Sequence, residues 1–253
     1  MLRKLRLQIG LICAWTLIIS GGVYAQSVGN ASEAVETDTT KAEKADIEQP
    51  PEIGVEQSWK LPRGAKEIGL EFGFAPMQPT FLSGREEYDT DGRKLALGSI
   101  RWGRVIGTTK GITFQYLFEA VPVAFAMKNE VRNPDFRSTK ETPGVPQTIR
   151  TNTFSMAINP AGFRFIFLPD RRLKPFVQAS AGFIFSKKPI PIPESPSYNF
   201  AADFGGGLMY SVTKRQTVNF GYRYFHISNM NIGEINPGYN ANVFYVGYSF
   251  FYK

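Results

Sequence analysis

Segments in which apolar and polar side chains alternate recur along most of this sequence. They lie near residues 66–77, 95–106, 111–123, 149–167, 176–185, 200–212, 217–228 and 242–252. A period of two places successive side chains on opposite faces of a strand. About ten residues is also the length with which a tilted strand crosses a bilayer. The sequence therefore predicts an all-β fold, an eight-stranded antiparallel transmembrane β-barrel, closed so that no strand edge meets lipid.

The alternation separates an apolar face from a polar one most clearly in the third and last segments. In the third, one face carries Ile112, Phe114, Tyr116, Phe118 and Ala120, and the other carries Thr113, Gln115 and Glu119. In the last, one face carries Phe244, Val246, Tyr248, Phe250 and Tyr252, and the other carries Gly247 and Ser249. A soluble, lipocalin-like barrel is the alternative, but it would turn its apolar face inward. The residues expected inside are polar or charged, which favours the membrane barrel: Glu119, Arg164, Asn219 and Arg223.

The connections between the segments alternate strictly between short and long. The short ones span 107–110, 168–175 and 213–216, and the long ones span 78–94, 124–148, 186–199 and 229–241. This pattern is typical of short periplasmic turns and long outer loops, and an even strand number places both termini in the periplasm. A barrel of this size is filled by its own side chains, so a wide pore is disfavoured. In the fourth segment the alternation slips around Asn159–Gly162, which predicts a bulge.

The region before the first strand divides into two parts of different composition. Residues 1–25 have a basic start, a short apolar core and a small residue before Gln26, as in a secretory signal peptide. Residues 26–60 are rich in Asp and Glu, which predicts a disordered periplasmic tail ahead of an outer-membrane barrel at 61–253. The single cysteine, Cys13, lies in the signal peptide, so we expect no disulfide, no thiolate nucleophile and no metal or other cofactor.

The net charge is also unevenly distributed along the chain. The whole chain carries +7, but the signal peptide carries +3 and residues 26–57 carry −6, which leaves +10 for residues 58–253. Nucleic acid is not an expected partner of an exported protein. The basic barrel is therefore expected to meet anionic lipid or polysaccharide.

The only histidine of the chain, His226, lies near the outer end of the seventh segment. It shares the outward parity of Tyr222 and Tyr224, and Ser228 continues that parity. On the eighth segment, Asn240 and Asn242 share the outward parity of the apolar residues that follow them. The pattern predicts that His226, Ser228 and Asn240 converge on the lipid-facing wall. Because Phe225 and Ile227 are apolar on the other parity, a bulge near residue 224 is an alternative that would exchange the two faces.

A stretch around this histidine resembles a known enzyme family. RYFHISNMNIGEINPGYN (223–240) is similar to the signature of the outer-membrane lipid A 3-O-deacylases of the PagL type, in which a His-x-Ser-Asn segment precedes an Asn-x-Gly turn. The likeness extends to Asn159–Arg164, to Lys174–Phe176 and to Phe185–Pro189. The resemblance implies a serine esterase that removes an acyl chain from lipopolysaccharide lipid A in the outer leaflet, as a monomer or homodimer among membrane lipid.

Roles for individual residues follow from this resemblance. Ser228 matches the nucleophile and His226 the general base, a pairing that activates a weakly nucleophilic hydroxyl. Asn229 and Asn236 match asparagines that support the site or donate to the oxyanion. Asn240 stands where the family carries an acidic residue, so its amide carbonyl would orient the imidazole without supplying a negative charge.

Two alternatives remain open from the sequence. The first concerns the acid, because Glu234 lies in the same loop and is a rival to Asn240. The second concerns the activity, because a non-catalytic small outer-membrane barrel that binds lipid or polysaccharide fits the same charge and strand pattern.

Overall fold

The described part of the chain consists of strands and their connections. The computed structural model describes residues 58–76, 92–136 and 144–253. The eight strands are β1 (Lys66–Ala75), β2 (Lys94–Thr109), β3 (Ile112–Arg132), β4 (Thr148–Phe167), β5 (Leu173–Ser186), β6 (Tyr198–Ser211), β7 (Gln216–Ser228) and β8 (Tyr239–Tyr252). None of the described residues belongs to a helix long and apolar enough to cross a membrane.

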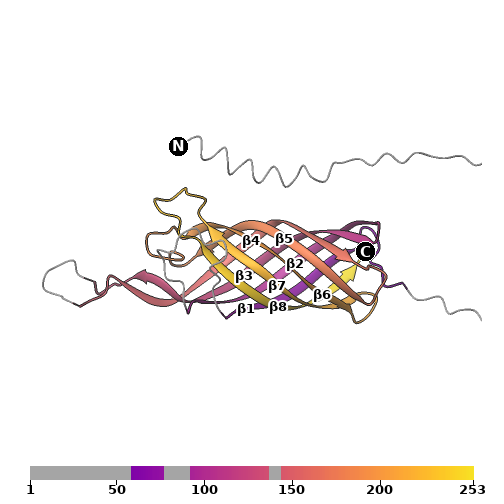
Figure 1. The fold of residues 1–253 in the computed structure, drawn as a ribbon, viewed down its shortest axis with the longest axis horizontal. Helices are drawn as coiled ribbons and strands as arrows, with labels where there is room; N and C mark the ends of the chain where they lie inside the picture. Colours follow the sequence, from indigo (N-terminus) through magenta and orange to yellow (C-terminus); the bar gives the residue numbers. More distant parts are fainter. Residues whose placement is uncertain (1–57, 77–91, 137–143) are drawn as a thin grey trace, which may run out of the picture. The chain divides into compact units, whose positions relative to one another are not determined.

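The strands form a closed antiparallel barrel in chain order, which confirms the predicted fold class (Figure 1). Closure comes from the pairing of β1 with β8, from Lys66 opposite Tyr252 to Phe74 opposite Phe244. The first residue of β1 and the last residue of β8 therefore lie at one end of the barrel, which we call the short-turn end. The other end, at which the strands enter and leave the longer connections, is the long-loop end.

The strand boundaries agree with the prediction to within three residues except in β3. This strand continues to Arg132, nine residues past its predicted end, and pairs with β4 as far as Thr148. The two strands extend together beyond their neighbours as a hairpin (Figure 1). The register of β3 shifts between Val121 and Ala124, where Pro122 lacks a backbone N–H, so the alternation is interrupted there. The predicted bulge in β4 is confirmed by a register shift between Ile158 and Ala161.

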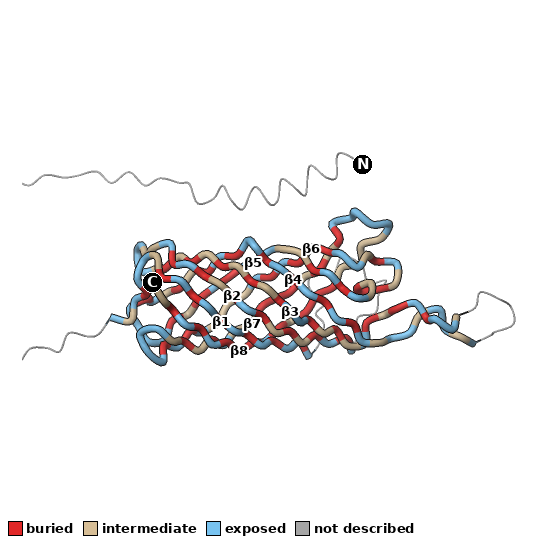
Figure 2. Tube along the Cα trace, turned by 180° about the vertical axis from the view of Figure 1, so that it is seen from behind, coloured by how far each residue is buried: buried red, intermediate tan, exposed pale blue. Residues whose placement is uncertain are grey.

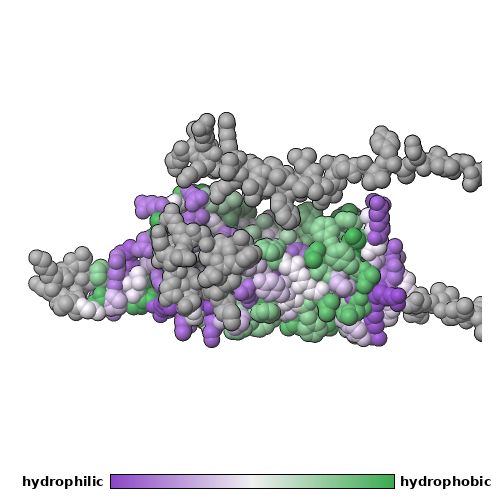
Figure 3. All heavy atoms as spheres, in the orientation of Figure 1, coloured by the Kyte–Doolittle hydropathy of each residue, from purple (hydrophilic) through white to green (hydrophobic). Residues whose placement is uncertain are grey.

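The outer wall of the barrel is apolar along most of each strand. Burial alternates residue by residue (Figure 2), and large apolar side chains on every strand point outward, among them Leu70 and Phe72, which are each 59% exposed. On the face shown in Figure 3, hydrophobic atoms gather on the visible wall of the barrel and hydrophilic atoms gather toward its two ends. An outward apolar band between polar ends is the arrangement of a transmembrane barrel, not of a lipocalin-like one.

The inside of the barrel has three layers. Charged side chains fill the middle, where Arg223 Nη1 contacts Glu119 Oε2 at 2.9 Å and Arg101 Nη1 contacts Glu71 Oε2 at 2.8 Å. The other predicted interior residues, Arg164 and Asn219, are also fully buried there. Apolar clusters close both ends: Phe225, Ile227 and Val243 belong to the long-loop end, and Phe251 and Val105 to the short-turn end.

The interior is therefore packed and does not form a pore. The void among Arg101, Glu119, Asn159, Gln178 and Arg223 has a volume of about 10 Å³, the size of a single water site. The expectation that a barrel of this size fills itself with side chains holds for the described residues.

Residues just before β1 are held at the short-turn end. The Trp59 ring lies under Arg172 and Lys214, and the Trp59 N–H donates to the Asp170 carbonyl at 3.2 Å. The predicted signal peptide, and residues 26–57 of the predicted acidic tail, lie outside the described residues.

Candidate active site on the outer wall

The seventh strand keeps its alternation to its end. β7 pairs with β6 and β8 without a register shift from Thr217 to Ile227. Phe225 and Ile227 point inward, where they are 3% and 2% exposed in the apolar cluster of the long-loop end. His226 and Ser228 consequently point outward, so the alternative of a face-exchanging bulge does not apply.

His226 lies directly opposite Asn240 of β8. The His226 Nδ1 atom is 2.5 Å from Asn240 Oδ1. Because an amide oxygen only accepts, Nδ1 carries the proton and Nε2 carries the lone pair. Asn240 is buried. The chain that returns into β8 passes close to the imidazole ring at Gly238, where an added Cβ would lie 3.5 Å from His226 Cε1. The geometry therefore fixes one tautomer, with Nε2 as the basic nitrogen.

Ser228 is the last residue of β7 and contacts the loop that follows. Asn236 Nδ2 donates to Ser228 Oγ at 2.9 Å, and Asn236 Oδ1 lies 3.2 Å from the same oxygen. The Met230 N–H also donates to Ser228 Oγ, at 3.0 Å. The Ser228 hydroxyl oxygen thus accepts from two N–H donors, and it lies on the same face of the barrel as His226.

Asn229 shapes the loop. Its side chain is buried, donates from Nδ2 to the Ile235 carbonyl at 2.7 Å and accepts from the Asn231 N–H at 2.9 Å. Its own N–H donates to Asn236 Oδ1 at 3.1 Å. Met230 and Asn231 turn the chain in the left-handed region, with φ of 54° and 62°, which costs energy for residues other than glycine. These contacts hold Asn236 beside Ser228.

The remaining predicted residue, Glu234, lies apart from these contacts. It is exposed and makes no hydrogen bond or ion pair with any residue that the structure describes. Within the described ranges no hydrogen bond joins the His226 ring to the Ser228 hydroxyl either. The structure therefore brings His226 to Asn240 and Ser228 to Asn236, and leaves these two pairs as neighbours on one face.

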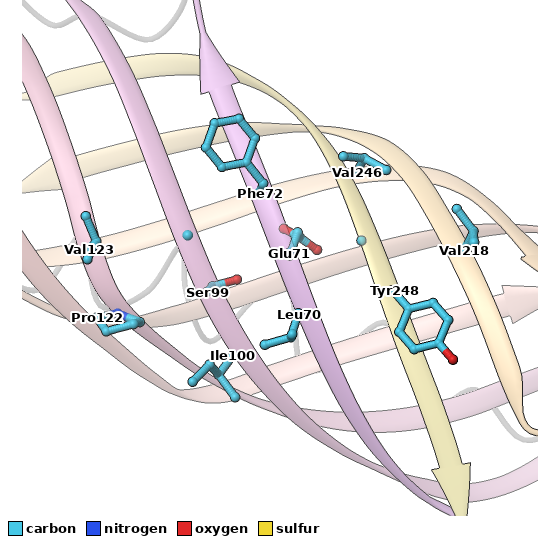
Figure 4. A pocket seen from close by; sticks show the side chains of 12 residues that line it. Leu70, Glu71, Phe72, Ser99, Ile100, Pro122, Val123, Val218, Val246 and Tyr248 are labelled. Atoms are coloured by element: carbon cyan, nitrogen blue, oxygen red, sulfur yellow. The ribbon is translucent and has the colours of Figure 1, made fainter.

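A hollow on the outer wall lies away from this site. It has a volume of about 590 Å³ and is lined by apolar side chains that include Leu70, Phe72, Ile100 and Val123 (Figure 4). It exists in part because Gly98 places no side chain on the wall, and a Cβ there would meet no atom within 4 Å. None of the predicted site residues lines this hollow.

Three features of the outer wall around the site were missed by reasoning from the sequence. The Met230 N–H and the Gly238 contact are backbone features of an irregular loop, for which no side-chain pattern gives a signal. The hydrogen bond between Tyr222 and Asn242 was missed too, although the shared outward parity of these residues was visible.

The chain is similar, at low sequence identity, to several solved structures. PagL, described as an outer membrane enzyme, is 16% identical, with a TM-score of 0.42, and the match covers 73% of this chain and 98% of that one. Neisserial surface protein A is 14% identical, with a TM-score of 0.42 over 74% and 99% of the two chains. Ail, the attachment invasion locus protein of Yersinia pestis, is 9% identical, with a TM-score of 0.40 over 76% and 100%. No curated protein matches the sequence.

A family model gives the assignment. The model of the lipid A 3-O-deacylase family, PagL, matches residues 123–249, a span that includes His226, Ser228 and Asn240. The chain therefore belongs to the PagL family of lipid A 3-O-deacylases and is a β-barrel of the bacterial outer membrane.

Proposed function

We propose that the chain is a serine esterase that hydrolyses an acyl ester of lipid A at the outer leaflet. The single observation that supports this proposal best is the contact of His226 Nδ1 with Asn240 Oδ1 at 2.5 Å. It orients the imidazole so that its basic nitrogen faces away from Asn240, on a wall where a lipid ester can approach.

The chemistry runs in two steps. The Ser228 Oγ attacks the ester carbonyl carbon while its proton passes to His226 Nε2, and the carbonyl oxygen becomes an oxyanion. When the oxyanion collapses, the sugar oxygen leaves and takes the proton from His226. Water then attacks the acyl-serine with His226 again as base, which releases the fatty acid and restores Ser228.

The donors around Ser228 suit the oxyanion. Asn236 Nδ2 and the Met230 N–H now point at the hydroxyl, at 2.9 and 3.0 Å. When Ser228 turns toward His226, these donors become available to the carbonyl oxygen. Catalytic hydrogen bonds are often long in the absence of substrate. We therefore assign Asn236 to the oxyanion and Asn229 to the support of the loop.

The proposed activity also requires the site to lie on the outer side of the membrane. We infer that the long-loop end faces the exterior, because the described connections at the other end are short. We further propose that residues 1–25 are a signal peptide, 26–60 a periplasmic tail and 61–253 the barrel. The oriented histidine and Ser228 would meet the glycolipid of the outer leaflet.

The proposal is tested by incubating the purified barrel with lipopolysaccharide in detergent and measuring released fatty acid by mass spectrometry. We expect release of an ester-linked chain, and none from heat-unfolded protein. A folded barrel that binds lipopolysaccharide but releases no fatty acid would instead be the non-catalytic lipid-binding barrel that the sequence left open.

A further inference from the structure

Two apolar hollows adjoin on the outer wall, away from the proposed site. The first, of about 590 Å³, lies mainly over β8, β1, β2 and β3 (Figure 4), and the second, of about 410 Å³, lies over β3, β4 and β5. Pro122 and Val123 of β3 line both hollows. The two hollows therefore meet at these residues, and we call them together the wall trough.

The wall trough is separate from the face that carries His226. On β8 it begins at Val246, six residues from Asn240, and on β7 it includes only Val218, eight residues from His226. Six residues of a strand span about 20 Å. The second hollow is centred on β4, which lies four strands from β8 in the closed barrel. A ligand in the wall trough is thus distinct from an ester held at Ser228.

A local change in strand pairing produces the trough. The pairing of β2 with β3 shifts between Gly98 and Ile100, and the pairing of β3 with β4 shifts between Val121 and Ala124. As a result Pro122 and Val123, although consecutive, are both exposed on the outer wall. Gly98 adds no side chain beside them. The trough follows from the backbone path and exists before any ligand binds.

The lining of the trough selects hydrocarbon. The second hollow is bordered by the exposed side chains of Phe154, Met156 and Phe185. Water in such a hollow finds no hydrogen-bond partners, and an empty hollow loses dispersion contacts. The wall belongs to an outer-membrane barrel, so the molecules that surround it are lipids. An acyl chain is therefore the occupant that fits.

Lysines lie at the long-loop end of the trough. Lys187 lines the second hollow, and its backbone N–H donates to the Phe154 carbonyl at 2.8 Å. Lys94 is exposed on the outward face of β2, four residues and about 13 Å beyond Gly98. Among the described residues, neither lysine forms an ion pair with a carboxylate. Ammonium groups at the end of an apolar trough favour a lipid with a negatively charged headgroup.

We propose that the wall trough binds one anionic membrane lipid, with an acyl chain along Gly98 and Val123 and its headgroup at Lys187 and Lys94. This lipid is bound and not cleaved. The inference does not depend on the proposed esterase activity, because none of the proposed site residues lines the trough.

Photo-crosslinking tests the position and the charge preference of the lipid. The purified barrel in phosphatidylcholine vesicles receives a small fraction of phosphatidylglycerol or phosphatidylcholine with the same diazirine-bearing chain, and peptide mass spectrometry locates the adducts. We expect phosphatidylglycerol adducts to concentrate on peptides containing Gly98–Ile100, Pro122–Val123 and Phe154–Met156. They should exceed phosphatidylcholine adducts there by about fivefold for each contributing lysine. Adducts spread evenly around the barrel, or equal for the two lipids, overturn the inference.

A pair of glycine substitutions tests the hollow itself. Gly98→Leu fills the first hollow and should lower phosphatidylglycerol labelling of these peptides severalfold. Gly107→Leu adds the same side chain to β2 outside the trough, where a Cβ also meets no atom within 4 Å, and should leave the labelling unchanged. Heat-modifiable gel mobility checks that each variant is folded. Wild-type labelling in a folded Gly98→Leu barrel overturns the inference.

A second set of variants tests the headgroup contact without altering the hollow. Lys94→Gln combined with Lys187→Gln should remove the preference for phosphatidylglycerol. Lys110→Gln, the same charge change at the short-turn end, should keep it. A preference that survives the double substitution overturns the inference. Fatty-acid release is no part of these measurements, so a failure of the proposed function leaves their outcome unchanged.

Discussion

Two groups of polar side chains, one inside the barrel and one on its outer wall, use their hydrogen bonds differently. Inside, each of Glu67, Glu71 and Glu119 contacts at least one guanidinium group, at distances down to 2.5 Å. On the wall, His226 is held from one side by a neutral amide, and its Nε2 has no hydrogen-bond partner among the residues that the structure describes. The interior glutamates are paired with guanidinium groups of other strands, whereas the wall group keeps capacity for a ligand. This difference indicates a structural role for the first and a chemical role for the second.

The largest expected effect on fatty-acid release comes from substitutions at the proposed site on the outer wall. Ser228→Ala or His226→Ala should lower fatty-acid release by about four orders of magnitude or more, because each removes the nucleophile or its base. The double substitution should be no worse than either single one, since the two residues act as a unit. Release is measured by mass spectrometry, and unchanged heat-modifiable gel mobility serves as the control for folding. A Ser228→Ala barrel with wild-type release would contradict the comparison.

An interior substitution should act on stability instead. Arg223→Met leaves the buried Glu119 without its guanidinium partner and leaves Glu71 with Arg101 alone, and the loss of one partner of a buried pair costs about 3–5 kcal/mol in free energy of unfolding. The measurement is the guanidinium chloride midpoint of the barrel in lipid vesicles. Adding Glu119→Leu should recover part of the loss, because it removes one unpaired charge. An unchanged midpoint for Arg223→Met would show that the interior network does not stabilise the fold.

The orienting amide gives a smaller effect on the wall. Asn240→Ala should lower turnover by about a hundredfold, because the ring loses the contact that fixes its position and tautomer. Asn240→Glu should preserve turnover or raise it, since a carboxylate also accepts from Nδ1 and stabilises the imidazolium. Glu234→Gln is the matched control and should have little effect. If Glu234→Gln is the damaging change, the loop carries the acid and our assignment of Asn240 is wrong.

The smallest effect is expected at the apolar hollow. Gly98→Leu fills open space on the wall without touching the site. Turnover and the unfolding midpoint should both stay close to the wild-type values. A large loss of turnover would mean that the hollow, and not only the β7–β8 face, takes part in binding the substrate.

The sequence was sufficient to predict the parts of the fold that depend on periodicity. Strand number, the alternation of short and long connections and the bulge after Ile158 all follow from the residue pattern. The end of β3 does not, because register shifts near Pro122 and Lys128 break the alternation while backbone pairing continues to Arg132. The apolar cluster inside the long-loop end was also missed. In the sequence, the apolar residues Phe225 and Ile227 could equally indicate a bulge that exchanges the inward and outward faces of the strand.

The site was predictable to a similar extent. The outward placement of His226, Ser228 and Asn240 follows from parity along paired strands. The contacts of Ser228 with Asn236 and with the Met230 N–H depend on two left-handed residues in an irregular loop. No periodic pattern encodes such a turn, so these contacts required the structure.

Ser228 is proposed to be a nucleophile on the lipid-facing wall. This role is tested most directly by treating the folded barrel with a long-chain alkyl fluorophosphonate, which forms a covalent bond with activated serines, and locating the adduct by peptide mass spectrometry. We predict modification of Ser228 in the wild type and loss of that modification in His226→Ala. A folded wild-type barrel with no adduct at Ser228, or with equal modification in His226→Ala, would contradict the claim.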